Sequence, residues 1–276
     1  MTGTAERLLR VEPIMGTVVG VDIRDPRSAG QVGAVDRFFD ALREIDRRFS
    51  PWRADSEISR VAAGELPERD ASADLRWILA VCDHLATSSG GAFDARHHRP
   101  DAGLDPSGFV KGWAIEEAAT QLEDAGIRNY AVNAGGDILV RGRPDAASGT
   151  GSATAGRAGW RVGIRHPDRA DRVATVISIS DLAVATSGLY ERGAHIRDPR
   201  TGAAPTELRS LTVVGPSLAW ADAYATAGFV MGLAGITWVT RHPGYHAIAI
   251  TADDRIVRTA SEFSGSSQPA ALSWAS

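Results

Sequence analysis

Residues 130–141, YAVNAGGDILVR, decide the fold that we expect. Two short runs, Tyr130–Asn133 and Ile138–Arg141, have the composition of strands and flank the residues Ala-Gly-Gly-Asp at 134–137. Glycine adopts the backbone angles that a tight turn needs, so the pattern predicts a β-hairpin. The same turn would let the backbone approach a ligand closely, although a plain β-turn is the ordinary interpretation of such a sequence.

Outward from this hairpin, helical and extended patterns are interleaved along the chain without a strict βαβ rhythm. Apolar residues at helical spacing predict helices near 31–49, 72–88, 107–126 and 217–232, and a shorter helix that ends near His242. Extended patterns predict further strands at 17–23, 160–165, 173–180, 183–186, 211–214, 246–251 and 256–259. This interleaving is typical of an α+β fold, with a mixed or antiparallel sheet core flanked by helices.

One segment stands out as a candidate boundary. Residues 144–159 are low in complexity and almost free of large side chains, which indicates a flexible surface loop or linker. We therefore expect a single domain over residues 1–276 with a flexible loop at 144–159.

The composition excludes several classes of protein. The chain has 276 residues and a formal net charge of −4, a balance that does not suggest a nucleic-acid binder. No stretch approaches the ~18 consecutive apolar residues of a membrane span. Residues 1–12 lack the apolar core of a signal peptide and the chain has no lipobox cysteine, so we expect a cytoplasmic location unless a signal was trimmed. The single cysteine, Cys82, lies on the apolar stripe of the 72–88 helix, which favours a core residue over a nucleophile.

Lys111 is the one lysine among 30 basic residues. A genome that favours Arg codons explains most of this bias, but it does not explain why one lysine remains. Lys111 lies in Ser107–Trp113 (SGFVKGW), where backbone N–H groups at a helix start, two glycines and an ammonium group would attract an anion. A glycine-rich helix entry without a ligand is the alternative interpretation.

Asp222 and Thr226 are four residues apart in a predicted helix, so both side chains lie on one helix face. A carboxylate and a hydroxyl are hard oxygen ligands that suit Mg²⁺ or Ca²⁺. From this spacing alone, a threonine bonded to its own helix and a solvent-facing aspartate remain the simpler interpretation.

His195 lies among hydroxyl, Arg and Asp side chains between Thr186 and Gly202. Such a group can transfer a proton and bind phosphate, although a lone histidine is more often structural. The run that contains Asp94, His97, His98, Asp101 and Asp105 superficially resembles a metal cluster, but a solvated loop is the ordinary interpretation.

The order of these blocks along the chain resembles the ApbE family of FAD:protein FMN transferases. The blocks extend over roughly residues 13–232 and are Met15-Gly16-Thr17, the segment 50–59, GAFD (91–94), LDPSGFVKGWAIEEA (104–118), VNAGGDILVRG (132–142), ATSGLYERGAHIRDPRTG (185–202) and ADAYATAGFVMG (221–232). The resemblance implies an ApbE-like catalytic domain that uses Mg²⁺ to transfer the FMN moiety of FAD to a Thr hydroxyl of an acceptor flavoprotein, with release of AMP.

The resemblance also implies roles for individual residues. Contacts with FAD are implied for Met15, Trp52, Ala92, Phe93, Asp94, Lys111, Glu116, Ser187, His195 and Ile196. Metal ligation is implied for Asp222, Thr226 and the main-chain carbonyl of Val110. The implied catalytic residues are His195, as the base beside the flavin phosphate, together with Asp222 and Lys111. Glu116 stands where relatives have Asp, and the segment before His195 is shorter than in relatives.

Three other functions stay open at this point. A hydrolase that cleaves FAD to FMN and AMP would use the same metal site, with water in place of Thr. A non-catalytic flavin-binding protein would not need Asp222, Thr226 and His195 together. Self-modification at Thr154 is the remaining alternative, because Gly151-Ser152-Ala153-Thr154 faintly resembles an acceptor pattern.

Overall fold

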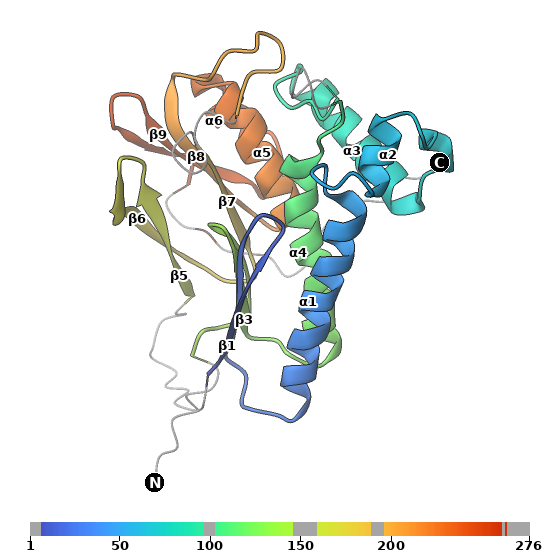
Figure 1. Ribbon diagram of the computed structural model, residues 1–276. Coiled ribbons are helices and arrows are strands. Elements are labelled where there is room, and N and C mark those ends of the chain that lie inside the picture. Colours follow the sequence, from blue (N-terminus) through green and yellow to red (C-terminus); the bar gives the residue numbers. More distant parts are fainter. Residues whose placement is uncertain (1–6, 97–102, 146–158, 189–195, 261–262, 264–276) are drawn as a thin grey trace.

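A computed structural model describes residues 7–96, 103–145, 159–188, 196–260 and 263. Within these residues, eight strands form one sheet in which every neighbouring pair is antiparallel. In spatial order they are β1 (Leu8–Ile14), β2 (Thr17–Ile23), β3 (Tyr130–Ala134), β4 (Asp137–Arg141), β7 (Ala183–Gly188), β8 (Leu208–Gly215), β9 (His246–Thr251) and β10 (Ile256–Arg258). The antiparallel sheet and its helices confirm the predicted α+β class (Figure 1).

The predicted hairpin at 130–141 is β3 and β4, which pair from Tyr130 with Arg141 to Ala134 with Asp137. Gly135 and Gly136 make the turn with φ values of 62° and 101°, the region that favours glycine. Gly135 has a second reason to be glycine, because a Cβ there would lie 2.2 Å from Thr17 Oγ1 on β2. The hairpin is therefore fixed both by its turn and by its neighbouring strand.

Both faces of the sheet are covered (Figure 1). Helices α1 (Gly30–Phe49), α4 (Ser107–Asp124) and α5 (Leu218–Val230) lie on one face, and the hairpin of β5 (Trp160–His166) and β6 (Arg169–Ile179) lies on the other. Leu139 of β4 belongs to the helix-side apolar cluster, whereas Val140 belongs to the cluster with Trp160 and Ile177. This alternation along one strand separates two cores, as expected for a sheet that is buried on both sides.

The remaining helices are short or peripheral. They are α2 (Glu57–Ala62), the 3-10 helix η1 (Glu68–Asp70), α3 (Ala73–Ser88) and α6 (Leu233–Val239). Cys82 lies on the buried side of α3 and is 2% exposed, and burial raises its pKa, which fits the predicted core role. Across the described part of the chain, no helix combines the length and the apolar composition that crossing a bilayer requires.

The main helices and strands were predicted to within a few residues, whereas β1, α2 and η1 were not predicted. Strand β1 contains Pro13 and alternates partly buried with exposed residues, so it lacks a strong strand pattern. It tolerates proline because it is the edge strand of the sheet, where an N–H can be absent without breaking a ladder. Most of the predicted loop at 144–159 lies outside the described residues, at 146–158.

Candidate active site

The candidate site is built along two helices, α4 and α5, that pack closely and run antiparallel (Figure 1). Their close approach depends on Gly112, because a Cβ there would lie 2.6 Å from Ala219 Cα and 2.6 Å from the Leu218 carbonyl oxygen. Near the start of α4, Asp105 Oδ1 accepts a hydrogen bond from Ser107 N at 3.0 Å. Ser217 is the N-cap of α5, where its side chain accepts a hydrogen bond from Trp220 N.

Lys111 on α4 places its ammonium group between two carboxylates. It forms an ion pair with Asp137 at the start of β4 and lies 3.4 Å from Asp222 Oδ2 on α5. The side chains of Asp137 and Asp222 are only 3% and 6% exposed. Asp137 Oδ1 also accepts a hydrogen bond from Thr186 N on β7 at 3.1 Å. Among the described residues, this group thus combines two nearly buried carboxylates with one partly exposed ammonium group.

Two hydroxyl groups lie next to this charged group. Ser187 Oγ on β7 and Thr226 Oγ1 on α5 are 3.2 Å apart. Thr226 faces the first turn of α4, since a Cβ at Gly108 would lie 3.6 Å from Thr226 Oγ1 and 3.1 Å from the ring of Phe93. The structure thus brings together Lys111, Ser187, Asp222, Thr226 and Phe93, which the sequence marked separately.

The donor set fits a hard divalent cation. Asp222 and Thr226 lie one turn apart on α5, on the side that faces Lys111 and Ser187. In the described residues no group of three or more His, Cys, Asp or Glu side chains could hold a metal ion. Proteins typically bind Mg²⁺ through one or two carboxylates, other oxygen atoms and several waters.

Other predicted cofactor contacts lie on loops and turns. Met15 and Gly16 form the turn between β1 and β2 with φ values of 54° and 66°, at the same end of the sheet as the turn at Gly135. Trp52 follows α1 and is 72% exposed. A large exposed aromatic ring beside a turn is suited to stacking on another ring.

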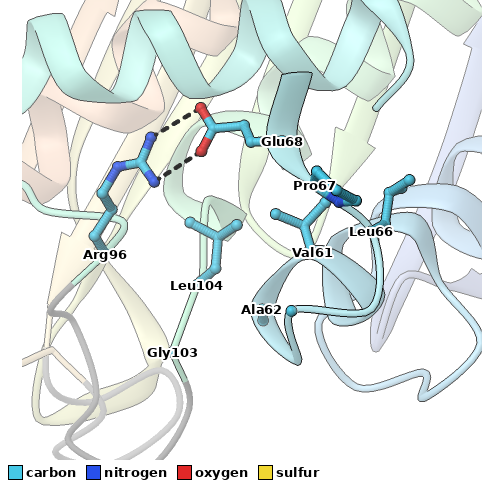
Figure 2. A pocket seen from close by; sticks show the side chains of 9 residues that line it. Val61, Ala62, Leu66, Pro67, Glu68, Arg96, Gly103 and Leu104 are labelled. Carbon is cyan, nitrogen blue, oxygen red and sulfur yellow. Dashed lines mark hydrogen bonds and ion pairs between the residues drawn. The ribbon is translucent and has the colours of Figure 1, made fainter. Parts of the chain in front are cut away.

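The segment Ala92–Asp94 follows α3, and its first two residues are buried. Phe93 N donates a hydrogen bond to Ser89 Oγ at 3.0 Å, and Asp94 Oδ1 accepts one from Arg96 N at 2.7 Å. A pocket of about 320 Å³ lies between α2, η1 and residues 103–104 (Figure 2), and its lining includes Arg96 but none of Ala92–Asp94. Arg96 forms one side of the pocket through its ion pair with Glu68 (Figure 2).

The described part of the HIRDPRTG block, residues 196–202, lies near the residues that follow α3. Ile196 is 5% exposed, and the Arg200 side chain lies against Gly91, 3.3 Å from where a Cβ would stand. Arg200 forms two hydrogen bonds with the Asp198 carboxylate, which lowers the pKa of that carboxyl. His195 lies outside the described residues, as do His97, His98 and Asp101.

Glu116 was predicted to contact FAD, and the structure places its carboxylate at the start of α5. It accepts hydrogen bonds from Ser217 Oγ at 2.9 Å, Leu218 N at 2.6 Å and Ala219 N at 3.3 Å. Burial raises the pKa of this carboxyl above its ordinary value, and these hydrogen bonds oppose that shift. The predicted contact with FAD stays a prediction.

Two residues of the site were noted in the sequence without the roles that the structure gives them. Asp137 was treated as part of a turn, although a carboxylate directly after Gly135-Gly136 was a visible signal. Gly108 was noted as a helix-entry glycine, but its position against Thr226 depends on a contact between distant segments. The carbonyl of Val110, predicted as a metal ligand, lies two residues further along the same helix.

The fold is that of solved flavin transferases. A structure titled flavin transferase ApbE from Vibrio cholerae matches with a TM-score of 0.74 at 25% identity and covers 92% of this chain and 96% of that one. The ApbE protein from Thermotoga maritima matches with a TM-score of 0.76 at 22% identity over 92% and 97% of the two chains, which supports the fold alone. A family model described as the ApbE family matches residues 15–99 and 95–249, so the chain belongs to the ApbE family.

Curated relatives carry a functional name. The FAD:protein FMN transferase of Treponema pallidum is 33% identical over 208 residues, which is 69% of this chain and 56% of the relative. The protein of the same name from Escherichia coli K12 is 33% identical over 171 residues, 58% of this chain and 46% of the relative. The chain thus spans about half the length of the curated relatives that it matches.

Proposed function

We propose that this chain transfers the FMN moiety of FAD to a Thr hydroxyl of an acceptor protein in a Mg²⁺-dependent reaction. The Thr oxygen forms a bond to the phosphorus of the FMN half, and the bond from that phosphorus to the bridging oxygen breaks. The bridging oxygen leaves with AMP, and the Thr proton passes to a base. Membership of the ApbE family and the names of the relatives support this reaction class.

The observation that carries the proposal is the position of Lys111 between Asp137 and Asp222, beside the hydroxyls of Ser187 and Thr226. Two nearly buried carboxylates beside one ammonium group favour a divalent cation, and a bound cation would make the site more positive. A site with net positive charge attracts a diphosphate, which is the part of FAD where the reaction occurs.

Individual residues have distinct roles in this proposal. Asp222, Thr226 and the Val110 carbonyl would hold Mg²⁺, which when bound polarises a phosphoryl oxygen and stabilises the charge that develops there. Lys111 orients Asp222 and adds positive charge to the phosphate site. His195 takes the proton of the attacking hydroxyl, a role that rests on the resemblance of its motif.

The remaining predicted contacts bind the two ends of FAD. Trp52 stacks on an aromatic ring of the substrate, and Met15 and the Ala92–Asp94 segment enclose it. Ser187 and Ile196, both nearly buried, complete the set of FAD contacts in this proposal. The partner is an acceptor protein that presents a Thr hydroxyl to the phosphorus atom.

The test measures AMP release from FAD in the presence of Mg²⁺ and an acceptor. Asp222→Asn is expected to abolish AMP release because it removes a buried charge while it keeps the side-chain shape. Asp124→Asn, at the exposed end of α4, is the matched control and should behave as the wild type. Addition of a chelator to the wild type should have the effect of Asp222→Asn. Unchanged AMP release under both treatments would overturn the metal assignment.

A further inference from the structure

Glu116 reaches from α4 to the first turn of α5 with a carboxylate that accepts three hydrogen bonds. Two of the donors, Leu218 N and Ala219 N, are backbone groups that have no partner inside their own helix. A carboxylate in this position also interacts favourably with the positive end of the helix dipole. Glu116 is therefore the residue of α4 that holds the start of α5.

The contacts between α4 and α5 follow one register. Residue numbers fall along α4 as they rise along α5, from the Glu116 end of the pair to its Gly108 end. The pairs are Glu116 with Leu218, Gly112 with Ala219, Lys111 with Asp222 and Gly108 with Thr226. The two metal-ligand candidates thus belong to the same series of contacts that Glu116 begins.

A small shift in the register between α4 and α5 would separate the residues of the proposed metal site. A helix rises about 1.5 Å and turns about 100° per residue. Slipping or rotating α5 by one residue would therefore turn Asp222 away from Lys111 and Thr226 away from Ser187. Gly112 fixes how closely the helices approach, and the hydrogen bonds of Glu116 fix where α5 begins.

We infer that Glu116 is a positioning residue for the metal site, which it serves by holding α5 in register with α4 so that Asp222 and Thr226 face Lys111 and Ser187. This inference rests on the proposed function for the identity of the site. It differs from the role that the family resemblance implies, in which Glu116 contacts the cofactor. The two roles predict different binding defects.

The experiment compares Glu116→Gln with the wild type and with Glu117→Gln, an exposed neighbour on the same helix. Gln keeps the length of the side chain, but its NH₂ group cannot accept from the donors of α5. Mn²⁺ affinity of the FAD-free protein is measured from the loss of the free-ion EPR signal, and FAD affinity without metal is measured by flavin fluorescence. Positioning predicts that Glu116→Gln weakens Mn²⁺ binding by about 10-fold or more, the usual effect of losing support behind a metal ligand.

FAD affinity without metal should stay within about two-fold of the wild type, because the helix N-terminus and not the cofactor is the partner of Glu116. The reverse result, normal Mn²⁺ binding with weakened FAD binding, would overturn the inference in favour of a cofactor contact. Thermal unfolding of each variant shows whether it folds. If Glu116→Gln does not fold, Ser217→Ala is the second variant, which removes one donor to Glu116 together with the N-cap hydrogen bond to Trp220 N. Weaker Mn²⁺ binding in this variant would support the anchoring of the start of α5 as the cause, and unchanged Mn²⁺ binding would overturn it.

The two proposals fail in different ways. If the wild type binds Mn²⁺ and Glu116→Gln binds it equally well, the positioning role is wrong and the proposed function is untouched. If the wild type binds no Mn²⁺, the metal site of the proposed function is wrong, and the positioning role falls with it.

Discussion

Lys111 Nζ lies 3.4 Å from Asp222 Oδ2, and this contact joins helices α4 and α5. In the sequence, strands β3 to β8 lie between these two helices. The same ammonium group also pairs with Asp137, so one cation serves two nearly buried carboxylates. Burying a carboxylate without a partner is costly, and this lysine offsets part of that cost for both carboxylates. Lys111 is the one lysine of the chain, and its contacts with two nearly buried carboxylates are a structural reason for a lysine at this position.

Lys111→Met should therefore destabilise the protein by about 3 kcal/mol, because it leaves two buried carboxylates without their shared cation. Urea unfolding followed by circular dichroism measures the change. The double variant Lys111→Met with Asp137→Asn should recover part of the loss, since it removes one of the two carboxylate charges that the lysine had balanced. A Lys111→Met variant as stable as the wild type would show that the ion pairs contribute little.

Gly112→Ala tests the close approach of α4 and α5. The added methyl group would lie 2.6 Å from backbone atoms of α5, so the helices must separate or unfold locally. We expect a loss of about 1–3 kcal/mol in stability, the usual cost of overpacking a core. Gly33→Ala on α1 is the control, because its methyl group meets only the end of Arg37 at 3.6 Å. The control should gain about 0.5–1 kcal/mol from better helix propensity, and a loss there would undermine the comparison.

The raised pKa of Glu116 predicts a pH dependence of stability. An acid whose pKa is higher in the folded protein contributes stability that is present below its ordinary pKa and is lost as the pH rises through the raised value. Glu116→Gln cannot ionise and keeps this contribution. The difference in unfolding free energy between the wild type and Glu116→Gln should thus shift in favour of the variant from about pH 4 to neutral pH. A difference that stays constant, or shifts toward the wild type, would contradict the raised pKa.

His195→Ala separates proton transfer from binding. If His195 is the general base, the variant should bind FAD within a few-fold of the wild type and flavinylate an acceptor ~10²–10⁴ times more slowly. Flavin fluorescence and a mass-spectrometric time course give the two quantities. Equal losses of affinity and rate would instead mean that His195 only holds the substrate.

Local patterns in the sequence were sufficient to predict most helices and strands. The stripe of Val35, Phe38 and Leu42 predicted α1 because amphipathic spacing reflects burial directly. Strand β1 was missed because Pro13 weakens its pattern, and its place in the sheet depends on pairing with β2 rather than on its own composition.

The site was predictable as a set of residues but not as an arrangement. The spacing of Asp222 and Thr226 indicated one helix face, and their joint position beside Ser187 depends on packing between β7 and α5. The ion pair of Lys111 with Asp137 joins helix α4 to the start of strand β4, and no periodicity in the sequence predicts that contact. The hydrogen bonds of Glu116 with α5 likewise exist only after the two helices pack.

The most direct test of the account is the intact mass of an acceptor protein after incubation with this protein, FAD and Mg²⁺. We predict that the acceptor gains the mass of one FMN less one water, that an acceptor with its target Thr changed to Val gains nothing, and that Asp222→Asn gives no product. An unchanged acceptor mass while AMP and free FMN accumulate would contradict the transfer reaction and identify the chain as an FAD hydrolase.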